Sequence, residues 1–479
     1  MWLFKDTNVR DFILLHYILS LHLPDEPEMN CFNNIYNRIK NSEQRSQLLI
    51  KNIAASFVIK GWSLIVQLLL VPVALNCLTI YEYGLWLTLS SVITWMDNFD
   101  IGLSNGLRNK LAEAVAHNDL HLAKELISTA VFTLSLLAVL LLTSLVAFVN
   151  TQDIYAMLNV DKSLVPNFRL VATLICINIS LTFAAKIIGS FFLALQKPAT
   201  NNLMASIAST LTLIGLWTLT IIGSKSFLLV CTIFTIMPLL SYITFSLYAF
   251  KYKYKEFCPS IKSFKKEAIK PLLSLGIKFF IGQISGMLLM STANIVISKA
   301  LSPAEVAPYQ IAYKYFMMIT IFFTLISTPI WSATTDAYNR GDIQWIKSTV
   351  RKIEYIEIGL FILLIGMLVL SNSFYAVWTT GKVHVEFSIS LWVAIYTFIL
   401  LLSMGYSNVI YGIGKMNLTV AIVCLMSIIF IISAYPITKE FGIKGLIAIQ
   451  SIVTFVCTLQ NMAQCKLILS GKAHGIFNK

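Results

Sequence analysis

The sequence predicts an all-α polytopic membrane protein, with twelve transmembrane helices in two parallel-repeat six-helix bundles around a central cavity. Of its 479 residues, 57% are hydrophobic and 12% charged, and the mean hydropathy is +0.76. Soluble domains average about 25% charged residues. Apolar runs of about 20 residues recur along the chain, each long enough to cross a bilayer as a helix. In addition, one stretch occurs twice, about 223 residues apart.

The apolar runs define twelve predicted spans. They must be helices, because lipid offers the backbone no hydrogen-bond partners. The predicted spans are about Ile53–Asn76, Tyr83–Asp100, Leu126–Val149, Phe168–Leu195, Asn201–Ile222, Phe227–Phe250, Leu272–Ala300, Tyr309–Trp331, Tyr355–Ser371, Ser388–Ile413, Asn417–Pro436 and Gly445–Leu469.

The repeated stretch runs from Leu78 to Lys124. In the second copy Glu82 falls on Glu305 and Asp119 on Asp342, without a gap. The matches are few, so they fit either a duplicated half-protein or two similar helix-end patterns; we favour duplication. Six spans return the chain to its starting side, so the halves would be parallel repeats. The predicted domains are a cytoplasmic segment 1–52, a first bundle 53–250, a basic linker 251–271, a second bundle 272–469 and a cytoplasmic tail 470–479.

The first 30 residues contain an apolar run, Phe12–Leu23, that is too short to span a membrane. An acidic, proline-containing break follows it. This pattern predicts that translation starts at Met29; the alternative is a short interfacial helix.

Lysine and arginine gather in the loops on one side of the predicted membrane. The linker alone holds seven lysines between Lys251 and Lys270. The positive-inside rule makes this side cytoplasmic, which places both termini inside. Lys262 is then cytoplasmic and Lys382 outside. The polar segments 103–126 and 332–352 are predicted to be short amphipathic helices at the inner interface.

Ionisable residues within spans are costly and usually face a polar interior. Lys60, Lys186, Lys278 and Lys314 fall within predicted spans. They predict a cationic cavity between the halves that holds an anionic substrate, with Lys60 and Lys186 as the first candidates. The alternative for Lys278 and Lys314 is that they extend to the membrane interface. The polar residues expected to line the same cavity are Gln67, Gln283 and Asn294.

Three charged residues stand at the inner end of the second span. Asp97, Asp100 and Arg108 are candidates for a cytoplasmic gate. The alternative is that the two aspartates only end the span and pair with Arg108.

The sequence shows no catalytic apparatus. There is no phosphate-binding loop, no metal-ligand cluster and no CxxC pair. We therefore expect no enzyme activity, no metal and no cofactor. The net charge of +13 lies in loops between spans, so nucleic acid is not an expected partner.

Two motifs identify a resemblance. IYEYGLW at Ile80–Trp86 and FDIGLSNGLRNKLAEA at Phe99–Ala114 resemble the polysaccharide transporter (Wzx-type O-antigen flippase) family of the multidrug/oligosaccharidyl-lipid/polysaccharide exporter superfamily. The resemblance extends over about Asn52–Leu469 and implies a twelve-helix, two-bundle fold. It also implies a flippase that moves an undecaprenyl-diphosphate-linked oligosaccharide to the outer leaflet by alternating access, coupled to H⁺ or Na⁺. Membrane lipid and other polysaccharide assembly proteins are the further partners it suggests.

Two other classes stay open. An ion-coupled multidrug or small-solute exporter fits the predicted spans equally well. The resemblance suggests an acidic residue in the first span of drug exporters, whereas this chain has Lys60 there. A membrane polysaccharide polymerase or transferase would need long loops or buried His/Arg clusters, and the sequence offers neither.

Overall fold

The computed structural model describes residues 44–97 and 102–478, and within these ranges the chain forms helices and no strands. Eight of the described helices are long and apolar enough to cross a membrane. Because lipid leaves backbone groups without partners, helices of this kind identify a multi-pass membrane protein. The prediction that the protein is helical and polytopic is therefore confirmed.

The first half of the chain, up to the linker, contains nine described helices. They are α3 (Gln44–Cys77), α4 (Ile80–Asp97), α5 (Leu103–Ala116), α6 (Leu120–Thr151), α7 (Ile154–Leu158), α8 (Phe168–Ala185), α9 (Ile187–Ala194), α10 (Pro198–Ile222) and α11 (Phe227–Tyr248).

Short helical turns form the linker, and long helices follow it. The turns are η1 (Ala249–Lys253), η2 (Lys255–Phe257), η3 (Ile261–Ser263) and η4 (Lys266–Ala268). The second half consists of α12 (Ile269–Ala300), η5 (Pro303–Glu305), α13 (Val306–Asn339), α14 (Ile343–Trp378), α15 (Phe387–Ile413), α16 (Asn417–Leu469) and η6 (Gly475–Asn478).

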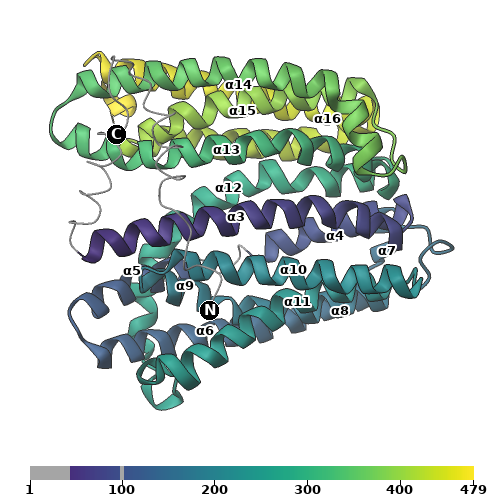
Figure 1. Ribbon diagram of the computed structural model, residues 1–479, viewed down its shortest axis with the longest axis horizontal. Coiled ribbons are helices and arrows are strands. Elements are labelled where there is room, and N and C mark those ends of the chain that lie inside the picture. The colour runs from purple at the N-terminus through teal and green to yellow at the C-terminus, as the bar shows by residue number, and fades with distance from the viewer. Residues whose placement is uncertain (1–43, 98–101, 479) are drawn as a thin grey trace, which may run out of the picture.

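The long helices lie side by side in two groups (Figure 1). In the first half α10 packs on α3 and α11, while α8 packs on α6 and α11; in the second half α15 packs on α13, α14 and α16. Helix α12 contacts both groups, with α5 and α4 on one side and α16 on the other. We name the end that carries α7 and residues 379–386 the outer end. The end that carries α5 and the linker is the inner end. Both names follow the topology predicted from the sequence.

Helix α5 buries the apolar face that the sequence shows. Leu107 and Leu111 are fully buried and Ala114 is 2% exposed. They belong to a core at the inner end that also takes residues from α6, α9 and α12. The amphipathic face of α5 thus packs on neighbouring helices.

Corresponding helix ends in the two halves lie 223 residues apart. Helices α3 and α12 end at Cys77 and Ala300, and α6 and α14 begin at Leu120 and Ile343. The residues before these two starts also correspond. Asp119 accepts a hydrogen bond from Leu122 N, and Asp342 accepts one from Trp345 N. Each aspartate satisfies an amide that would otherwise have no partner at the helix start. The local repeat seen in the sequence therefore has a structural counterpart.

The two halves differ between these matching ends. In the first half α5 begins after Gly102, which has a φ of 76°. In the second half α13 continues without interruption to Asn339, and α14 begins at Ile343. The segment 332–352, predicted to form an amphipathic helix of its own, instead extends two long helices that meet at a tight turn. Helix α13 contains no glycine, and it continues through the region that corresponds to Gly102.

The ranges of the twelve predicted spans fall on helices wherever the structure describes them. The last two ranges share α16, which bends at Gly442, where φ is 66°. The predicted start at Met29 and the apolar run before it lie outside the described residues.

Candidate functional site

A row of hydrogen-bonded polar side chains joins the two halves. Asn294 Nδ2 of α12 donates to Ser91 Oγ of α4 at 2.8 Å, and Asn294 Oδ1 accepts from Gln310 Nε2 of α13 at 2.7 Å. Asn294 and Ser91 are buried. An amide that satisfies both its donor and its acceptor in a buried place fixes the positions of the helices around it. Asn294, predicted to line the cavity, lies at this contact.

Lys314 continues the polar row along α13. It follows Gln310 by four residues, so the two side chains share one helix face. Lys314 is partly buried, and none of the described carboxylates forms an ion pair with it. A cation in this position adds positive charge to the boundary between the halves.

Lys60 and Gln67 lie seven residues apart on α3, and both side chains are exposed. Trp62 Nε1 donates to Thr210 Oγ1 of α10 at 3.0 Å, which shows the side of α3 that faces α10. Residues two apart on a helix point about 200° apart. Lys60 therefore points away from the contact with α10.

Lys186 stands at the bend between α8 and α9. It ends the first helix and precedes the second. Its side chain is partly buried, with Nζ 5.4 Å from the centre of the Phe183 ring. This arrangement shields the ammonium on one side by an aromatic face. Lys186 is thus in the same half as Lys60, but it lies between α8 and α9 whereas Lys60 lies on α3.

Several other predicted site residues cannot be placed together. The side chains of Lys278, Gln283 and Asp97 lie outside the described set, and so does Asp100 altogether. Arg108 is exposed on α5. The proposed gate of Asp97, Asp100 and Arg108 stays a prediction.

The halves also meet at the outer end through contacts that the sequence did not suggest. Trp378 Nε1 of α14 donates to Leu68 O of α3 at 2.8 Å. Lys382 Nζ, in the turn after α14, donates to Leu75 O at 2.8 Å and to Asn76 Oδ1 at 2.6 Å. These bonds hold the end of α3 against the second half.

A second set of outer contacts links α12 to the segment around α7. Ser298 Oγ donates to Leu158 O at 2.9 Å, and Asn159 Nδ2 donates to Leu301 O at 2.8 Å. Most of these outer bonds have a backbone carbonyl as acceptor, so sequence patterns alone could not reveal them. Together the two sets join the halves at the outer end, beside the apolar core that both halves share.

The outer end also has an open pocket of about 620 Å³. Asp153, Tyr155, Lys162 and Arg169 are among the residues that line it. Lys162 Nζ lies 5.1 Å from the centre of the Tyr155 ring. None of these residues was predicted as a site residue, because three of them lie in a short segment between spans and Arg169 stands at the start of a span, where a charge is common.

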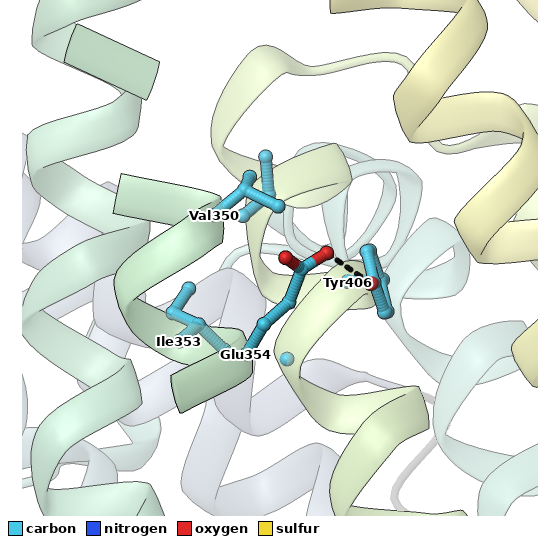
Figure 2. A pocket seen from close by; sticks show the side chains of 6 residues that line it. Val350, Ile353, Glu354 and Tyr406 are labelled. Carbon is cyan, nitrogen blue, oxygen red and sulfur yellow. Dashed lines mark hydrogen bonds between the residues drawn. The ribbon is translucent and has the colours of Figure 1, made fainter. Parts of the chain in front are cut away.

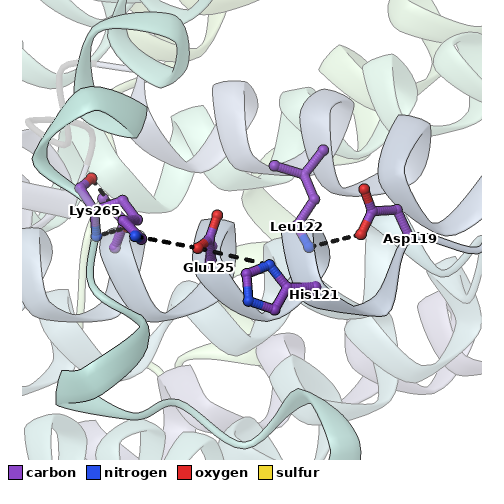
Figure 3. A network of polar contacts seen from close by, with 6 residues as sticks. Asp119, His121, Leu122, Glu125 and Lys265 are labelled. Carbon is purple, nitrogen blue, oxygen red and sulfur yellow. Dashed lines mark hydrogen bonds and ion pairs between the residues drawn. The ribbon is translucent and has the colours of Figure 1, made fainter.

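At the inner end the basic linker is fastened to α6 (Figure 3). Glu125 of α6 lies 3.8 Å from Lys265 Nζ and 3.7 Å from His121 Nδ1. Thr129 Oγ1 accepts from the Lys265 backbone N at 3.0 Å, and Ser128 Oγ accepts from Ser260 N at 3.1 Å. The part of the linker from Ser260 to Lys265 is therefore held against α6 of the first half.

Exposed ion pairs at both ends perturb two carboxyl groups. The hydrogen bond from Lys110 at 2.9 Å, together with its charge, lowers the pKa of Glu113 on α5. The hydrogen bond from Lys444 at 2.9 Å lowers the pKa of Glu386, and a hydrogen bond from Ser388 adds to this effect. Among the residues that the structure describes, no group of three or more His, Cys, Asp or Glu is placed to hold a metal ion.

The fold is similar to that of solved membrane transporters. The chain resembles an inward-facing multidrug resistance MATE family transporter of the MOP superfamily, with a TM-score of 0.70 and 13% identity over 87% of this chain and 95% of the other. An outward-facing transporter of the same family aligns with a TM-score of 0.63 and 12% identity over 91% and 98%. The protein therefore has the fold of a MATE-like membrane transporter.

The family follows from the sequence comparisons. The family model "Polysaccharide biosynthesis protein" matches residues 49–334, and the chain belongs to this family. A Salmonella typhi protein named "Putative O-antigen transporter" is 23% identical over 399 residues, covering 80% of this chain and 87% of that protein. The resemblance to the polysaccharide transporter family is thereby confirmed.

Proposed function

We propose that this protein is a flippase, which moves a polyprenyl-diphosphate-linked oligosaccharide from the inner to the outer leaflet of the bacterial cytoplasmic membrane. Membership of the polysaccharide biosynthesis family is the observation that carries the proposal. The name of the Salmonella typhi relative supports an O-antigen or related surface unit as the cargo.

The mechanism we propose is alternating access between the two halves. The two halves meet through hydrogen bonds at the outer end, such as Trp378 to Leu68 and Ser298 to Leu158, and through a buried apolar core where α4 packs on α12 and α13. Each such bond contributes about 1 kcal/mol net. Hydrogen bonds of this size can be exchanged during a transport cycle, and the apolar contacts of α4 with α12 and α13 would repack with them.

The topology we propose has twelve spans and both termini in the cytoplasm. Its support is the fit of the predicted spans to the described helices and the 223-residue spacing of helix ends. The halves are parallel repeats of six spans, joined by the linker 251–271. Cysteine labelling from outside should reach residue 382 and not residue 262, and the reverse result would overturn this topology.

The substrate contacts we propose are cationic. A diphosphate needs compensating positive charge where water is scarce. Lys60 on the exposed face of α3 and Lys186 at the α8–α9 bend would contact the headgroup first, with Lys278 and Lys314 as further contacts and Gln67, Gln283 and Asn294 lining the path. Helix α3 contains no acidic residue over its full described length. This supports an anionic cargo over a cationic one.

We propose that the protein is a transporter without cofactor or enzyme activity, driven by H⁺ or Na⁺. Its other partners would be membrane lipid and further proteins of polysaccharide assembly.

The test uses a bacterium deleted for the gene and complemented with variants. The deletion should leave lipid-linked oligosaccharide in the inner leaflet. Lys60→Ala and Lys186→Ala should each lower surface polysaccharide by about tenfold or more, because one charge-assisted contact is worth about 1.5–3 kcal/mol. Lys60→Arg should restore export, and Lys439→Ala, at an exposed position, should export normally.

Full export by both alanine variants at equal membrane abundance would overturn the cationic cavity. The alternative function, an ion-coupled multidrug exporter, is favoured by the MATE-like fold. It would be supported if the deletion changed drug efflux and left lipid-linked oligosaccharide unchanged.

A further inference from the structure

The second half contains two carboxyl groups that play no part in the proposed substrate path. Glu354 and Glu357 are three residues apart on α14, so they share one helix face. They lie in the inner part of the helix, against α15. Glu357 is only 2% exposed, and Glu354 is partly buried. Figure 2 shows Glu354 directed from α14 toward Tyr406 of α15.

The two carboxyl groups have unequal partners. Tyr406 Oη donates to Glu354 Oε1 at 2.7 Å. Glu357 Oε1 is buried and has no hydrogen-bond partner among the described residues. An unpaired, buried polar atom is rare in a native structure and calls for a physical reason.

Helix α15 is shaped to receive Glu357. A Cβ at Gly405 would lie 2.2 Å from Glu357 Oε1 and 3.0 Å from Ile353 Cγ2. Only glycine leaves space for the carboxyl group at that position. Glu357 is therefore directed into the α14–α15 contact, which is lined by Val350, Ile353, Glu354, Gly405, Tyr406 and Val409.

The surroundings supply no counter-charge. Tyr406 comes from α15, and the Cys465 thiol of α16 is close enough to interact with Glu354; Lys466 follows Cys465 on the same helix. Lys466 is exposed, and the described part of the chain shows no ion pair with Glu354 or Glu357. From α13 no titratable side chain acts on Glu357, whose one charged neighbour among the described residues is Glu354.

Two adjacent carboxylates without a cation would bury like charges in an apolar contact, which is strongly unfavourable. One proton on Glu357 removes one charge and adds an O–H donor. The side chains that line this contact between α14 and α15 leave no space for a water molecule. A proton on Glu357 has no water beside it while α14 and α15 are packed together, so its exchange requires the helices to separate or the proton to pass to the partly exposed Glu354.

We propose that Glu354 and Glu357 form a proton-binding site in the second half, which holds one exchangeable proton while α14 and α15 are packed together. Tyr406 positions Glu354, and Gly405 admits Glu357. That this proton drives export rests on the proposed flippase function; that the site binds it does not.

The first experiment examines the binding step by infrared difference spectroscopy on the full-length protein in lipid nanodiscs at neutral pH. The carbonyl stretch of a protonated carboxylic acid, and its shift in D₂O, reports the proton. The wild type should show this band. Glu357→Gln should lose it, because the amide donates to Glu354 without a proton. Glu354→Gln should keep it, because Glu357 is then alone and buried.

Glu440→Gln is the matched control, because Glu440 is exposed on α16, and it should leave the band unchanged. Thermal unfolding confirms that the glutamine variants fold. A band that persists in Glu357→Gln would overturn the proposal. A band removed from the wild type by Na⁺ at constant pH would overturn it in favour of a metal-cation site.

The second experiment measures transport of the lipid-linked oligosaccharide in proteoliposomes with and without a pH gradient. The gradient should stimulate the wild type and Glu440→Gln, and Glu357→Gln should lose this stimulation. Absence of any wild-type transport alongside an intact infrared band would refute the flippase function and leave the proton site standing. Wild-type transport without the band would refute the proton site alone.

Discussion

Gly84 is the residue at which a single methyl group should separate the two halves. It lies on α4 against the backbone of η5, and a Cβ at this position would be 1.8 Å from the Pro303 carbonyl oxygen. Ordinary contacts begin at 3.4 Å, so Gly84→Ala requires the two backbones to move apart by about 1.6 Å. No side chain can rotate to relieve the clash, because the obstructing atom is part of the main chain.

The expected magnitude follows from the cost of overpacking, which is typically about 1–3 kcal/mol. If the protein alternates between a conformation closed at the outer end and one open there, this cost falls on the closed conformation. It then shifts the equilibrium between the two by about 5- to 150-fold. Gly84→Ala should therefore populate a form in which the outer end is open. The bonds from Ser298 and Trp378 should break in that form, since they join the same two halves.

The assay is the distance between two spin labels at the outer end. Lys225→Cys, after α10, and Lys439→Cys, on α16, place labels at exposed positions in opposite halves. Cys31 and Cys258 are replaced by serine in the labelled protein. Gly84→Ala should move the distance distribution to longer values.

Gly61→Ala is the control, because a Cβ at Gly61 meets no atom within 4 Å. An unchanged distribution in Gly84→Ala would refute the reasoning, and so would an equal shift in Gly61→Ala.

Two further predictions concern stability. Lys444 lowers the pKa of the Glu386 carboxyl group in the folded protein. Such a group stabilises the folded protein above its unfolded-state pKa, and this contribution is lost as the pH falls through the folded-state pKa. Glu386→Gln should therefore be less thermally stable than the wild type at pH 7, and the difference should disappear once the pH is well below about 4.5. A difference that grew on acidification would contradict this sign. Asn294→Leu leaves Ser91 and Gln310 without their partner, and it should lower the unfolding free energy by about 1–3 kcal/mol in a denaturation series. Asn339→Ala, at an exposed position, should have no comparable effect.

Much of the fold could be predicted because lipid restricts the backbone to helices. Span positions follow from apolar length alone. The repeat paired Asp119 with Asp342, and the structure shows that these two residues cap α6 and α14. The uninterrupted α13 was missed, because a polar composition at 332–352 suggested a separate interfacial helix. Polarity indicates contact with water, but it does not end a helix. In the first half α5 begins as a separate helix after Gly102, whose φ is 76°.

The candidate site was only partly predictable, for a different physical reason. Sequence position shows that Lys60, Lys186 and Asn294 lie within spans, but not which helices meet them. Glu357 was missed although it lies within the predicted span Tyr355–Ser371. Two residues from the end of a span, a carboxylate is usually solvated, and only the packing of Gly405 shows that this one is buried.

The outer contacts were beyond prediction because they join side chains to backbone carbonyls of distant helices. Trp378 and Leu68 are far apart in sequence, and a carbonyl acceptor gives no residue preference on its α3 side. Only the three-dimensional arrangement brings them together.

The most direct measurement for the flippase function is leaflet exchange by the purified protein. Vesicles are made with the protein and a fluorescent polyprenyl-diphosphate oligosaccharide, and a membrane-impermeant reagent destroys the label that lies in the outside leaflet. With the protein, label initially in the inside leaflet should become accessible, and a vesicle sample with Lys60→Ala should be slower by about tenfold or more. Exchange no faster than in protein-free vesicles would contradict the account.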